Sequence, residues 1–390
     1  MKIVFLHSGS DLYGASRCLV RLASCLRRDG HLVEVWIPAD GPIRTELESA
    51  GVLCETVPEL NVLTRGKYSR PRAMAGYGLD FFRSAALLAR NIRSSRADLV
   101  HTNTAVLPAA GLAARLAGKP HLWHVREWFG EFPFAWTLYQ WYLAGNAKRL
   151  VCVSQTVRSQ FHPLLRKRAR VIYDGFPASA FAAITPERSR AFRTAFGLEG
   201  HLVVGVVGRI KWKRKGQETF ARAAALIRKT HPDARFICIG SPFPGNESHL
   251  AALQQLAAEL SLGREWIITG DVTDNLGAIA ALDVLVHPPG QPEPFAGVVI
   301  EAMALGKPVV GTNLGGTIEQ VEHNVTGFLV PPDDPPALAR AVAALLDDES
   351  LRHRMGEQGR ARYLALFGWD PFYRSILAEY SAIMGSNVLL

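Results

Sequence analysis

The sequence has few cysteines and no long apolar run, and each shortage excludes a class of protein. Its five cysteines show neither metal-ligand nor redox spacing, and their number is odd. We therefore expect buried, reduced thiols in a cytoplasmic protein rather than a disulfide framework or a metal site. No stretch approaches about 18 apolar residues, so no membrane-spanning helix is expected. The N-terminal apolar run is too short for a signal peptide and predicts a first strand.

Acidic residues are scarce in the first half of the chain. Residues 1–180 hold 24 Lys or Arg against 13 Asp or Glu, a net charge of +11, whereas the remainder holds 20 against 22. This excess predicts that the first half meets something anionic: a membrane surface, a phosphorylated acceptor or nucleic acid. No recognition motif for nucleic acid accompanies the charge, so nucleic acid is not expected. A solvated basic face is the alternative.

Short β-branched runs alternate with helical patterns throughout, which is typical of βαβ units and parallel sheets. The sequence predicts one series of strands at 2–7, 32–37, 52–57, 98–101, 121–125 and 149–153, and a second at 202–208, 235–240, 266–269, 284–287 and 308–311. Helices are predicted near 15–29, 78–95, 105–117, 134–145 and 369–384.

The two series predict an α/β protein with two Rossmann-like domains, each a doubly wound parallel sheet. We expect the first domain at residues 1–176, the second at 177–368, and a C-terminal crossover helix and tail at 369–390 that returns toward the first domain. Open parallel sheets bind ligands beyond the carboxyl ends of their strands. The site is therefore expected in a cleft where those ends face each other.

Two carboxylates eight residues apart stand out in the second domain. Glu293 comes at the end of a Pro/Gly loop that follows a strand. A helix starting near Gly297 and Val298 would carry Glu301 one turn further along, on the same face as Gly297. The free N–H groups at such a helix start suit an anion. Glu301 would accept hydrogen bonds from the two vicinal hydroxyls of a ribose. An ordinary loop before a helix with a stabilising early Glu is the alternative.

Two more loops in the second domain follow strands. Arg209 at a strand end and Lys215 at a helix entry would converge on a diphosphate, since Arg offers a fork and Lys a point charge. A solvated charge run is the alternative. The turn Gly315-Gly316-Thr317 opens another helix, where glycines allow close backbone approach and N–H groups suit phosphate or sugar oxygens.

In this order these motifs resemble those of family 4 retaining glycosyltransferases of the GT-B fold, and the resemblance covers nearly the whole chain. It implies a metal-independent enzyme that moves a sugar from a nucleotide diphosphate sugar, a co-substrate rather than a cofactor, to a glycan or lipid-linked acceptor. The expected context is polysaccharide or glycolipid assembly. The first domain would bind the acceptor and the second the donor.

The resemblance also implies roles for single residues. Arg209 and Lys215 would grip the donor diphosphate, Glu301 the ribose, and Glu293 the transferred sugar. The predicted catalytic residues are His124, Arg209, Lys215 and Glu293. The predicted donor-binding residues are Gly14, Gly297, Val298, Glu301, Gly316 and Thr317.

Gly14 belongs to a loop, residues 9–16, that follows the first strand and opens a helix. Family members place a Gly-rich loop near the donor phosphate and the acceptor at this point. The loop lacks the Walker spacing and the dinucleotide Gly-x-Gly-x-x-Gly pattern, which disfavours an ATPase or a nicotinamide enzyme. It also lacks the adjacent Gly-Gly that is common in the family.

His124 ends a predicted strand where the family's active-site His falls. His121 is its rival, but it lies at the start of the same strand and is expected to point away from the cleft. Residues 101–103, at the end of the preceding strand, would line the same cleft. Tyr173-Asp174-Gly175 is expected to be only the interdomain turn.

Aromatic and basic residues are concentrated on the acceptor side. Nine aromatics lie between Trp123 and Tyr142, and residues 65–96 carry eight Arg or Lys against one Asp. Basic residues with exposed aromatics suit an anionic membrane surface, where lipid-linked acceptors are presented. This predicts a peripheral position on the inner face of the membrane. An aromatic-rich core beneath a solvated basic face is the alternative.

Two other functions remain open on this fold. A nucleotide-sugar epimerase would release free epimerised sugar nucleotide without any acceptor, and a non-catalytic binding protein would hold the donor without turnover. The presence of both cations and both carboxylates disfavours the second. The sequence does not distinguish UDP, GDP or ADP as the nucleotide, nor does it identify the acceptor.

Overall fold

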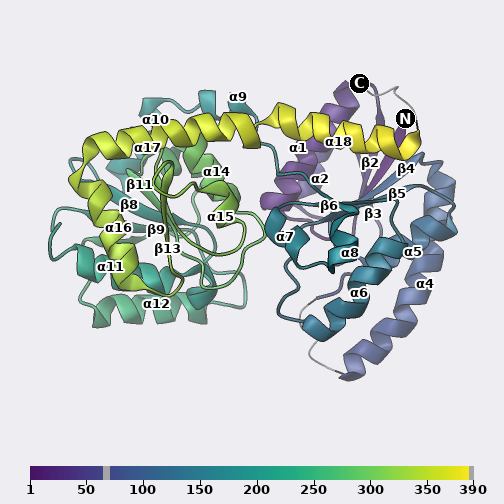
Figure 1. Ribbon diagram of the computed structural model, residues 1–390, viewed down its shortest axis with the longest axis horizontal. Helices are drawn as coiled ribbons and strands as arrows, with labels where there is room; N and C mark the ends of the chain where they lie inside the picture. The colour runs from purple at the N-terminus through teal and green to yellow at the C-terminus, as the bar shows by residue number, and fades with distance from the viewer. Residues whose placement is uncertain (65–70, 386–390) are drawn as a thin grey trace. The chain divides into compact units, whose positions relative to one another are not determined.

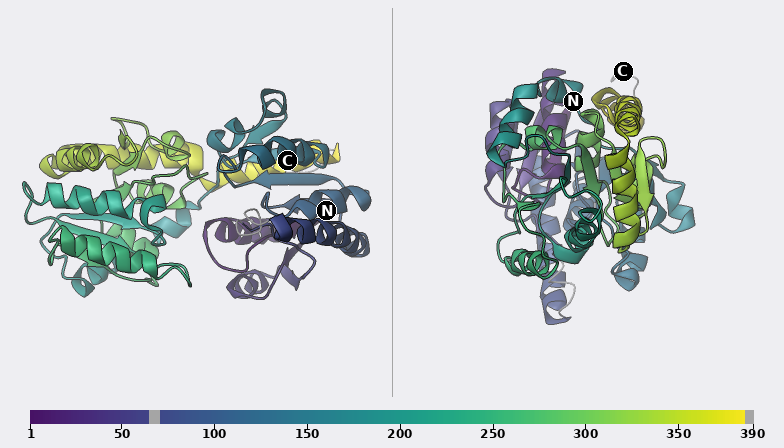
Figure 2. Two further views of the ribbon diagram at one scale, coloured as in Figure 1. Left: turned by 90° about the horizontal axis from the view of Figure 1, so that it is seen from below. Right: turned by 90° about the vertical axis from the view of Figure 1, so that its left-hand side faces the viewer.

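The computed structural model describes residues 1–64 and 71–385 and divides the chain into two compact units. Unit 1 holds Met1–Asp174 together with the segment from Phe372 onward, and unit 2 holds Gly175–Pro371. Each unit contains one parallel sheet with helices on both sides (Figures 1 and 2). The two doubly wound parallel sheets predicted from the sequence are thereby confirmed.

Unit 1 has a seven-stranded sheet in the order β3-β2-β1-β4-β5-β6-β7. Its strands are β1 (Lys2–Leu6), β2 (Leu32–Ile37), β3 (Leu53–Thr56), β4 (Leu99–Thr102), β5 (His121–Val125), β6 (Arg149–Cys152) and β7 (Ala169–Val171). Its helices are α1 (Gly14–Arg28), α2 (Pro42–Ser49), α4 (Pro71–Ser95), α5 (Pro108–Leu116), α6 (Pro133–Gly145), α7 (Gln155–Ser159), α8 (Pro163–Arg166) and, from Phe372 on, α18 (Trp369–Met384). The strand order reverses direction between β1 and β4, where doubly wound sheets open a crevice.

Unit 2 has a six-stranded sheet in the order β10-β9-β8-β11-β12-β13. Its strands are β8 (Val203–Val207), β9 (Arg235–Ile239), β10 (Trp266–Ile268), β11 (Val284–His287), β12 (Val309–Thr312) and β13 (Gly327–Val330). Its helices are α9 (Ala178–Ala182), α10 (Pro186–Ala195), α11 (Gln217–Ile227), α12 (Ser248–Glu259), α13 (Asn275–Ala280), α14 (Gly297–Ala304), α15 (Thr317–Gln320), α16 (Pro335–Asp347) and α17 (Glu349–Arg362). The order reverses between β8 and β11.

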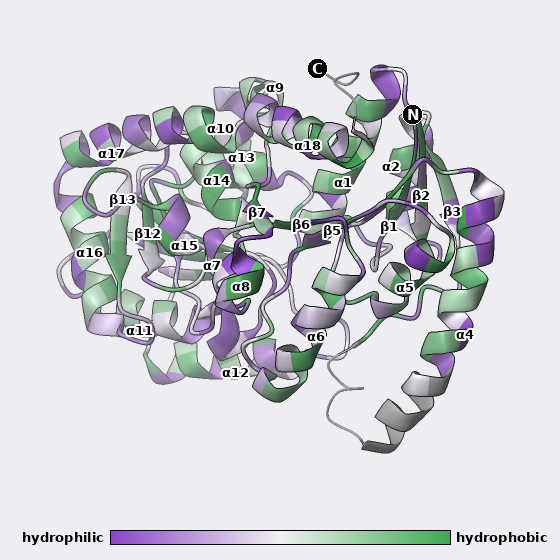
Figure 3. Ribbon diagram, turned by 45° about the vertical axis from the view of Figure 1, so that its right-hand side comes forward, coloured by the Kyte–Doolittle hydropathy of each residue, from purple (hydrophilic) through white to green (hydrophobic). Residues whose placement is uncertain are grey.

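The central strands of both sheets are apolar on both faces because helices cover both sides. All four residues of β4, β11 and β12 are buried. Figure 3 shows this pattern as mostly green strands in the sheet of unit 1. Many helices begin at a proline, whose fixed φ and missing N–H suit the first turn, as in α5, α6 and α16.

Two strands and several helices, including α2, α12, α16 and α17, were not predicted from the sequence. Strands β7 and β13 lie at the edges of their sheets, with only three and four residues. A run of only three or four residues gives little periodic signal in the sequence. Helix α2 is only eight residues long.

The five cysteines are all free, four of them buried and Cys25 half-buried. Among the described residues, no helix combines the length and the hydropathy needed to cross a bilayer.

Candidate functional site

Three loops meet at the carboxyl edge of the unit 2 sheet. They follow the adjacent strands β8, β11 and β12, beside the point where the strand order reverses. The sequence analysis placed Arg209 and Lys215 in the first loop, Glu293 in the second and Gly316 in the third. Parallel strands bring such loops together at one edge, and here the three loops touch through Glu293.

Lys215 and Glu293 form an ion pair, with Lys215 Nζ 2.5 Å from Glu293 Oε1. Glu293 is only 8% exposed. Burial alone would raise the pKa of Glu293, but the charge and hydrogen bond of Lys215, with the charge of Arg214, lower it below its usual value. The carboxylate is therefore ionised and pins the ammonium group at the sheet edge.

His287, the last residue of β11, lies on the other side of the Glu293 carboxylate. Its Nε2 is 3.6 Å from Glu293 Oε2 and has no hydrogen-bond partner in the described part of the chain. Burial lowers the pKa of His287 to about 4, so the ring is neutral at pH 7. His287 was not predicted as a site residue, although a histidine that ends a buried strand just before the Glu293 loop was the available signal.

Glycines allow the loops to approach each other. The N–H of Gly316 donates to the carbonyl of Glu293 at 2.7 Å. Gly315 has φ +62°, and a Cβ there would lie 2.6 Å from both the N and the O of Glu293. Gly216 has φ +72°, and a Cβ there would lie 1.7 Å from the carbonyl oxygen of Pro288. Any larger residue at these positions would push the loops apart.

The loop after β8 is tied at both ends by Gln217, which is 1% exposed. Its Nε2 donates to the carbonyl of Arg209 at 3.0 Å, and its Oε1 accepts from the N–H of Lys211 at 3.4 Å. Gln217 was not predicted, because its partners are backbone groups that only the folded loop brings near.

The Arg209 side chain lies against the loop after β9. Its guanidinium sits 4.8 Å from the ring centroid of Phe243, and Nη1 donates to the carbonyl of Pro242 at 3.3 Å. These contacts hold Arg209 with Phe243, whereas Lys215 is held with Glu293. Convergence of the two cations on one diphosphate stays a prediction.

Helix α14 begins at Gly297, where the sequence analysis expected a helix to start. Its N-cap, Ala296, offers no side-chain oxygen, so Gly297 and Val298 open the helix without a side-chain cap. Glu301 follows four residues after Gly297 and is half-buried. Thr317, fully buried, opens the four-residue helix α15, and its Oγ1 has no hydrogen-bond partner among the described residues. Donor binding by these residues stays a prediction.

In unit 1, His124 is fully buried near the end of β5. Its Nδ1 lies 3.5 Å from Nη2 of Arg126. Because a guanidinium group only donates, Nδ1 must accept and the ring proton sits on Nε2. Burial, followed by the charge of Arg126, lowers the pKa of His124 well below its usual value. His124 is thus a neutral N–H donor whose Nε2 has no partner in the described part of the chain.

Arg126 connects several buried groups that the sequence analysis did not link. Its Nη1 lies 2.7 Å from each carboxylate oxygen of Asp174, and its Nε donates to Asn103 Oδ1 at 2.9 Å. Asp174, expected to be only part of an interdomain turn, is 9% exposed and also accepts a hydrogen bond from Cys18. The turn residue is therefore an ion-pair partner.

The other histidines of this sheet are held by protein groups. His121 bonds through Nε2 to Thr102 Oγ1 at 2.8 Å and through Nδ1 to the carbonyl of Asn146 at 2.7 Å. Both ring nitrogens are satisfied, which fits a structural residue. His101 Nδ1 bonds to the Tyr380 hydroxyl of α18 at 2.7 Å, so this histidine anchors the C-terminal helix.

The loop at Gly14 is held by side chains. Ser16 Oγ lies 3.0 Å from His7 Nε2 and donates to Asp11 Oδ1 at 3.2 Å, and the same Asp11 oxygen accepts from the N–H of Tyr13 at 3.1 Å. Helix α1 begins at Gly14 itself, which is exposed, and a Cβ there would meet no described heavy atom within 4 Å. A donor-binding role for Gly14 stays a prediction.

The aromatic region divides into a core and an exposed face. Trp123, Phe129 and Trp136 are buried, whereas Phe134 is 91% and Trp141 is 46% exposed. Of the predicted basic residues, Arg65, Lys67 and Arg70 lie outside the described residues, as does the side chain of Arg72. The described ones, namely Arg83, Arg90, Arg93 and Arg96, are exposed.

Two family models match the chain. The model described as Glycosyltransferase Family 4 matches residues 13–179, and the model described as Glycosyl transferases group 1 matches residues 189–362. The chain is therefore similar to glycosyltransferases along most of its length. The two matches fall on the two units, which agrees with the resemblance found in the motifs.

Individual relatives match over part of their length. Spore coat protein SA of Bacillus subtilis (strain 168) is 28% identical over 239 residues, covering 58% of this chain and 62% of that protein. A D-inositol 3-phosphate glycosyltransferase of Salinispora arenicola (strain CNS-205) is 32% identical over 222 residues, covering 55% of this chain and 49% of that protein. The matches thus span less than two thirds of these curated relatives.

A crystal structure of Alr3699/HepE from Anabaena, in complex with UDP, is similar over nearly the whole chain. The TM-score is 0.83 at 25% identity, and the match covers 98% of this chain and 100% of that one. This likeness confirms the GT-B fold.

Proposed function

We propose that this chain transfers a sugar from a nucleotide diphosphate sugar to a glycan or lipid-linked acceptor, with retention at the anomeric carbon. The arrangement at the carboxyl edge of the unit 2 sheet carries the proposal. There Lys215 is pinned by Glu293, the Gly315-Gly316 turn packs on the same loop, and helix α14 begins at Gly297 without a side-chain cap. A cation beside an uncapped helix start suits a diphosphate.

We take the donor to be a UDP-linked sugar, because the similar Anabaena protein was crystallised with UDP. In this assignment Glu301 accepts hydrogen bonds from the ribose hydroxyls. Glu293, already ionised, accepts one from the transferred sugar.

The proposed reaction breaks the bond between the anomeric carbon and the leaving phosphate oxygen and forms a bond to the acceptor oxygen on the same face. The acceptor proton passes to the leaving diphosphate. Lys215 and Arg209 stabilise the negative charge that grows on that phosphate. Since side chains supply this positive charge, we propose that no metal is required, and turnover should persist in EDTA.

His124 supplies a neutral group to this reaction. With Nδ1 facing Arg126, its Nε2–H is left to donate to a hydroxyl of the sugar or the acceptor. We therefore assign it the orientation of that hydroxyl rather than proton removal.

We also propose that unit 1 docks on an anionic membrane surface, where a lipid-linked acceptor is presented. Phe134, Leu138 and Trp141 follow each other at helical spacing on one face of α6 and are 91%, 78% and 46% exposed. Phe82, 67% exposed, lies on α4, which packs against α6 through Phe81 and Tyr142. Exposed arginines of α4 would add attraction for anionic lipids. With five free cysteines, we place this face in the cytoplasm.

Vesicle binding tests the docking. The chain should bind phosphatidylglycerol vesicles at low salt and release them at high salt. The double substitution Phe134→Ser and Leu138→Ser should weaken binding, whereas Leu116→Ser on α5, also an exposed leucine at 48%, should not. Equal binding by both variants would contradict the assignment to α6.

The proposed activity is tested by ligand stabilisation followed by product analysis. A thermal-shift panel of UDP, GDP, ADP and their sugars identifies the donor, because a ligand at 100 times its Kd adds about 2.7 kcal/mol of stability. Incubation with that donor and candidate acceptors should then yield a product whose anomeric proton shows the donor's configuration. Free epimerised sugar nucleotide would instead indicate an epimerase, and donor binding without any turnover would indicate a binding protein.

A further inference from the structure

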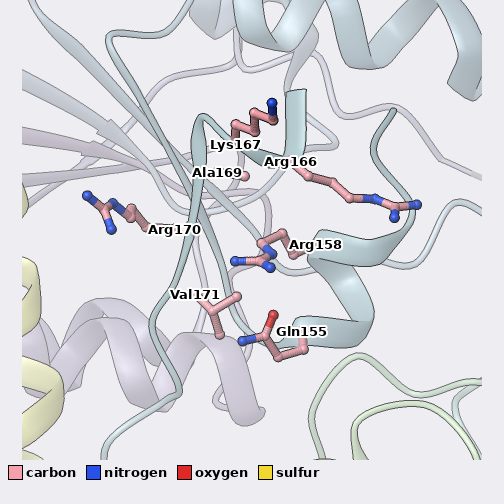
Figure 4. Close-up of a pocket in the computed structure, with 7 residues that line it drawn as sticks. All are labelled: Gln155, Arg158, Arg166, Lys167, Ala169, Arg170 and Val171. Carbon is pink, nitrogen blue, oxygen red and sulfur yellow. The ribbon is translucent and has the colours of Figure 1, made fainter. Parts of the chain in front are cut away.

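Unit 1 contains a basic pocket that none of the assigned residues lines. Its volume is about 380 Å³, within the range of about 300–1,000 Å³ typical of small-molecule sites. Helices α7 and α8 and strand β7 form it (Figure 4). Its cationic lining residues are Arg158, Arg166, Lys167 and Arg170, and its apolar ones are Ala169 and Val171.

The pocket has positive charge without a counter-charge. Residues 155–171 contain five Lys or Arg and no Asp or Glu. Within the described chain, Arg158, Lys167 and Arg170 form no ion pair and no hydrogen bond through their side chains. Arg166 differs, because its Nε donates to the carbonyl of Phe161 at 2.7 Å and so holds the rim.

Two arginines of unit 1 that lie beside carboxylates show the contrast. Arg44 is paired with Asp40, and Arg126 with Asp174. Like charges gathered without a carboxylate repel each other, and a bound anion relieves that repulsion. Figure 4 shows Arg158 in the middle of the group, between Arg170 on one side and Arg166 on the other. Buried Ala169 and half-buried Val171 form an apolar wall that strengthens charge interactions nearby.

We propose that this pocket binds a phosphate group, with the Arg158 and Arg170 guanidinium groups as its principal donors. Guanidinium forks match phosphate oxygens, and Lys167 adds a point charge. Resting on the proposed function, the ligand is the acceptor, which is then a phosphomonoester or diphosphate. That phosphate belongs either to a soluble sugar phosphate or to a lipid headgroup, and both present the same oxygens to the pocket.

Titration of inorganic phosphate into the full chain at low ionic strength, followed by calorimetry, tests the pocket. Each charge-assisted bond contributes about a tenfold factor in affinity. Arg158→Gln with Arg170→Gln should therefore weaken phosphate binding by about a hundredfold. Arg168→Gln is the matched control, because Arg168 is exposed on the same segment but does not line the pocket, and it should change affinity by less than about twofold.

Three results would overturn the proposal: no phosphate binding by the wild-type chain, an unchanged affinity in the double variant, or an equal loss in Arg168→Gln. Titration with glucose 6-phosphate and with vesicles containing phosphatidic acid then distinguishes the two sources of phosphate. The double substitution should weaken binding only of the ligand type that occupies the pocket. If the double substitution weakens binding of neither ligand, the assignment of the pocket to the acceptor is wrong. UDP stabilisation is measured in parallel, because its absence in the wild-type chain would count against the proposed function and not against the pocket.

Discussion

Replacing Lys215 by alanine separates the contribution of its ion pair to folding from its contribution to the proposed reaction. Lys215 Nζ lies 2.5 Å from Glu293 Oε1, and the Glu293 side chain is 11% exposed. The substitution therefore leaves a nearly buried carboxylate with only neutral His287 at 3.6 Å. The pKa of Glu293 should rise, because Lys215 is the largest influence that lowers it.

The structure limits the stability cost. Breaking a fully buried pair costs about 3–5 kcal/mol, but the Lys215 side chain is 28% exposed, so water can reach the vacated position. We expect a loss of about 1–2 kcal/mol in the free energy of unfolding. The effect on turnover should be larger. Losing one preorganised contact to the leaving phosphate raises the barrier by about 3 kcal/mol, on the order of a hundredfold in rate.

The double variant Lys215→Ala with Glu293→Gln distinguishes the two effects. It removes the uncompensated charge, so the free energy of unfolding should return most of the way to the wild-type value. Turnover should stay low, because neither the cation nor the carboxylate is restored. Denaturant unfolding and the initial rate of UDP release measure the two quantities, and Lys229→Ala, an exposed lysine of unit 2, is the control.

Near-normal turnover in Lys215→Ala would refute the role assigned to the cation. Recovery of turnover in the double variant would show that the lysine serves only to neutralise Glu293. Either outcome would leave the unit 2 site without its proposed source of positive charge.

Three further predictions concern other parts of the chain. His124→Ala should lower the transfer rate more than donor affinity, which single-turnover and donor-binding measurements compare; a change in donor binding alone would contradict the assignment. Gly315→Ala should cost about 2–3 kcal/mol of unfolding free energy, because φ is +62° and the new Cβ meets backbone at 2.6 Å; Gly145→Ala, with no described atom within 4 Å, should not destabilise. Burial lowers the pKa of His121 and His287 to about 4. Each neutral ring therefore contributes fully to the free energy of unfolding above pH 6.5, and this contribution is lost as the pH falls toward 4. At pH 5 each histidine should lower the free energy of unfolding by about 2 kcal/mol. Equal melting temperatures at pH 8 and pH 5 would contradict this prediction.

Much of the architecture was predictable because it is encoded locally. β-branched runs of strand length, separated by helical periodicity, predicted most strands to within one or two residues and the helix that starts at Gly297. Strands β7 and β13 were not predicted, although the equally short edge strands β3 and β10 were. The motif order along the chain was enough to indicate the family.

The contacts inside the site were not predictable in the same way. Nothing near Glu293 in the sequence indicates that Lys215 is its partner, because the two residues come from different loops. His287 begins the loop that carries Glu293, but only the folded loop brings its ring to the carboxylate. Arg126 likewise holds Asp174 and His124 through distances that only the folded sheet sets.

The sequence by itself determined the two parallel sheets, their motifs and the residue types that reach each strand end, because these depend on periodicity and on glycine and proline at fixed positions. Only the tertiary structure decided which charges are paired, which histidines are neutral donors, and which aromatics of α6 stay exposed. Burial and pairing depend on residues distant in the chain, and those become neighbours only when the sheets pack.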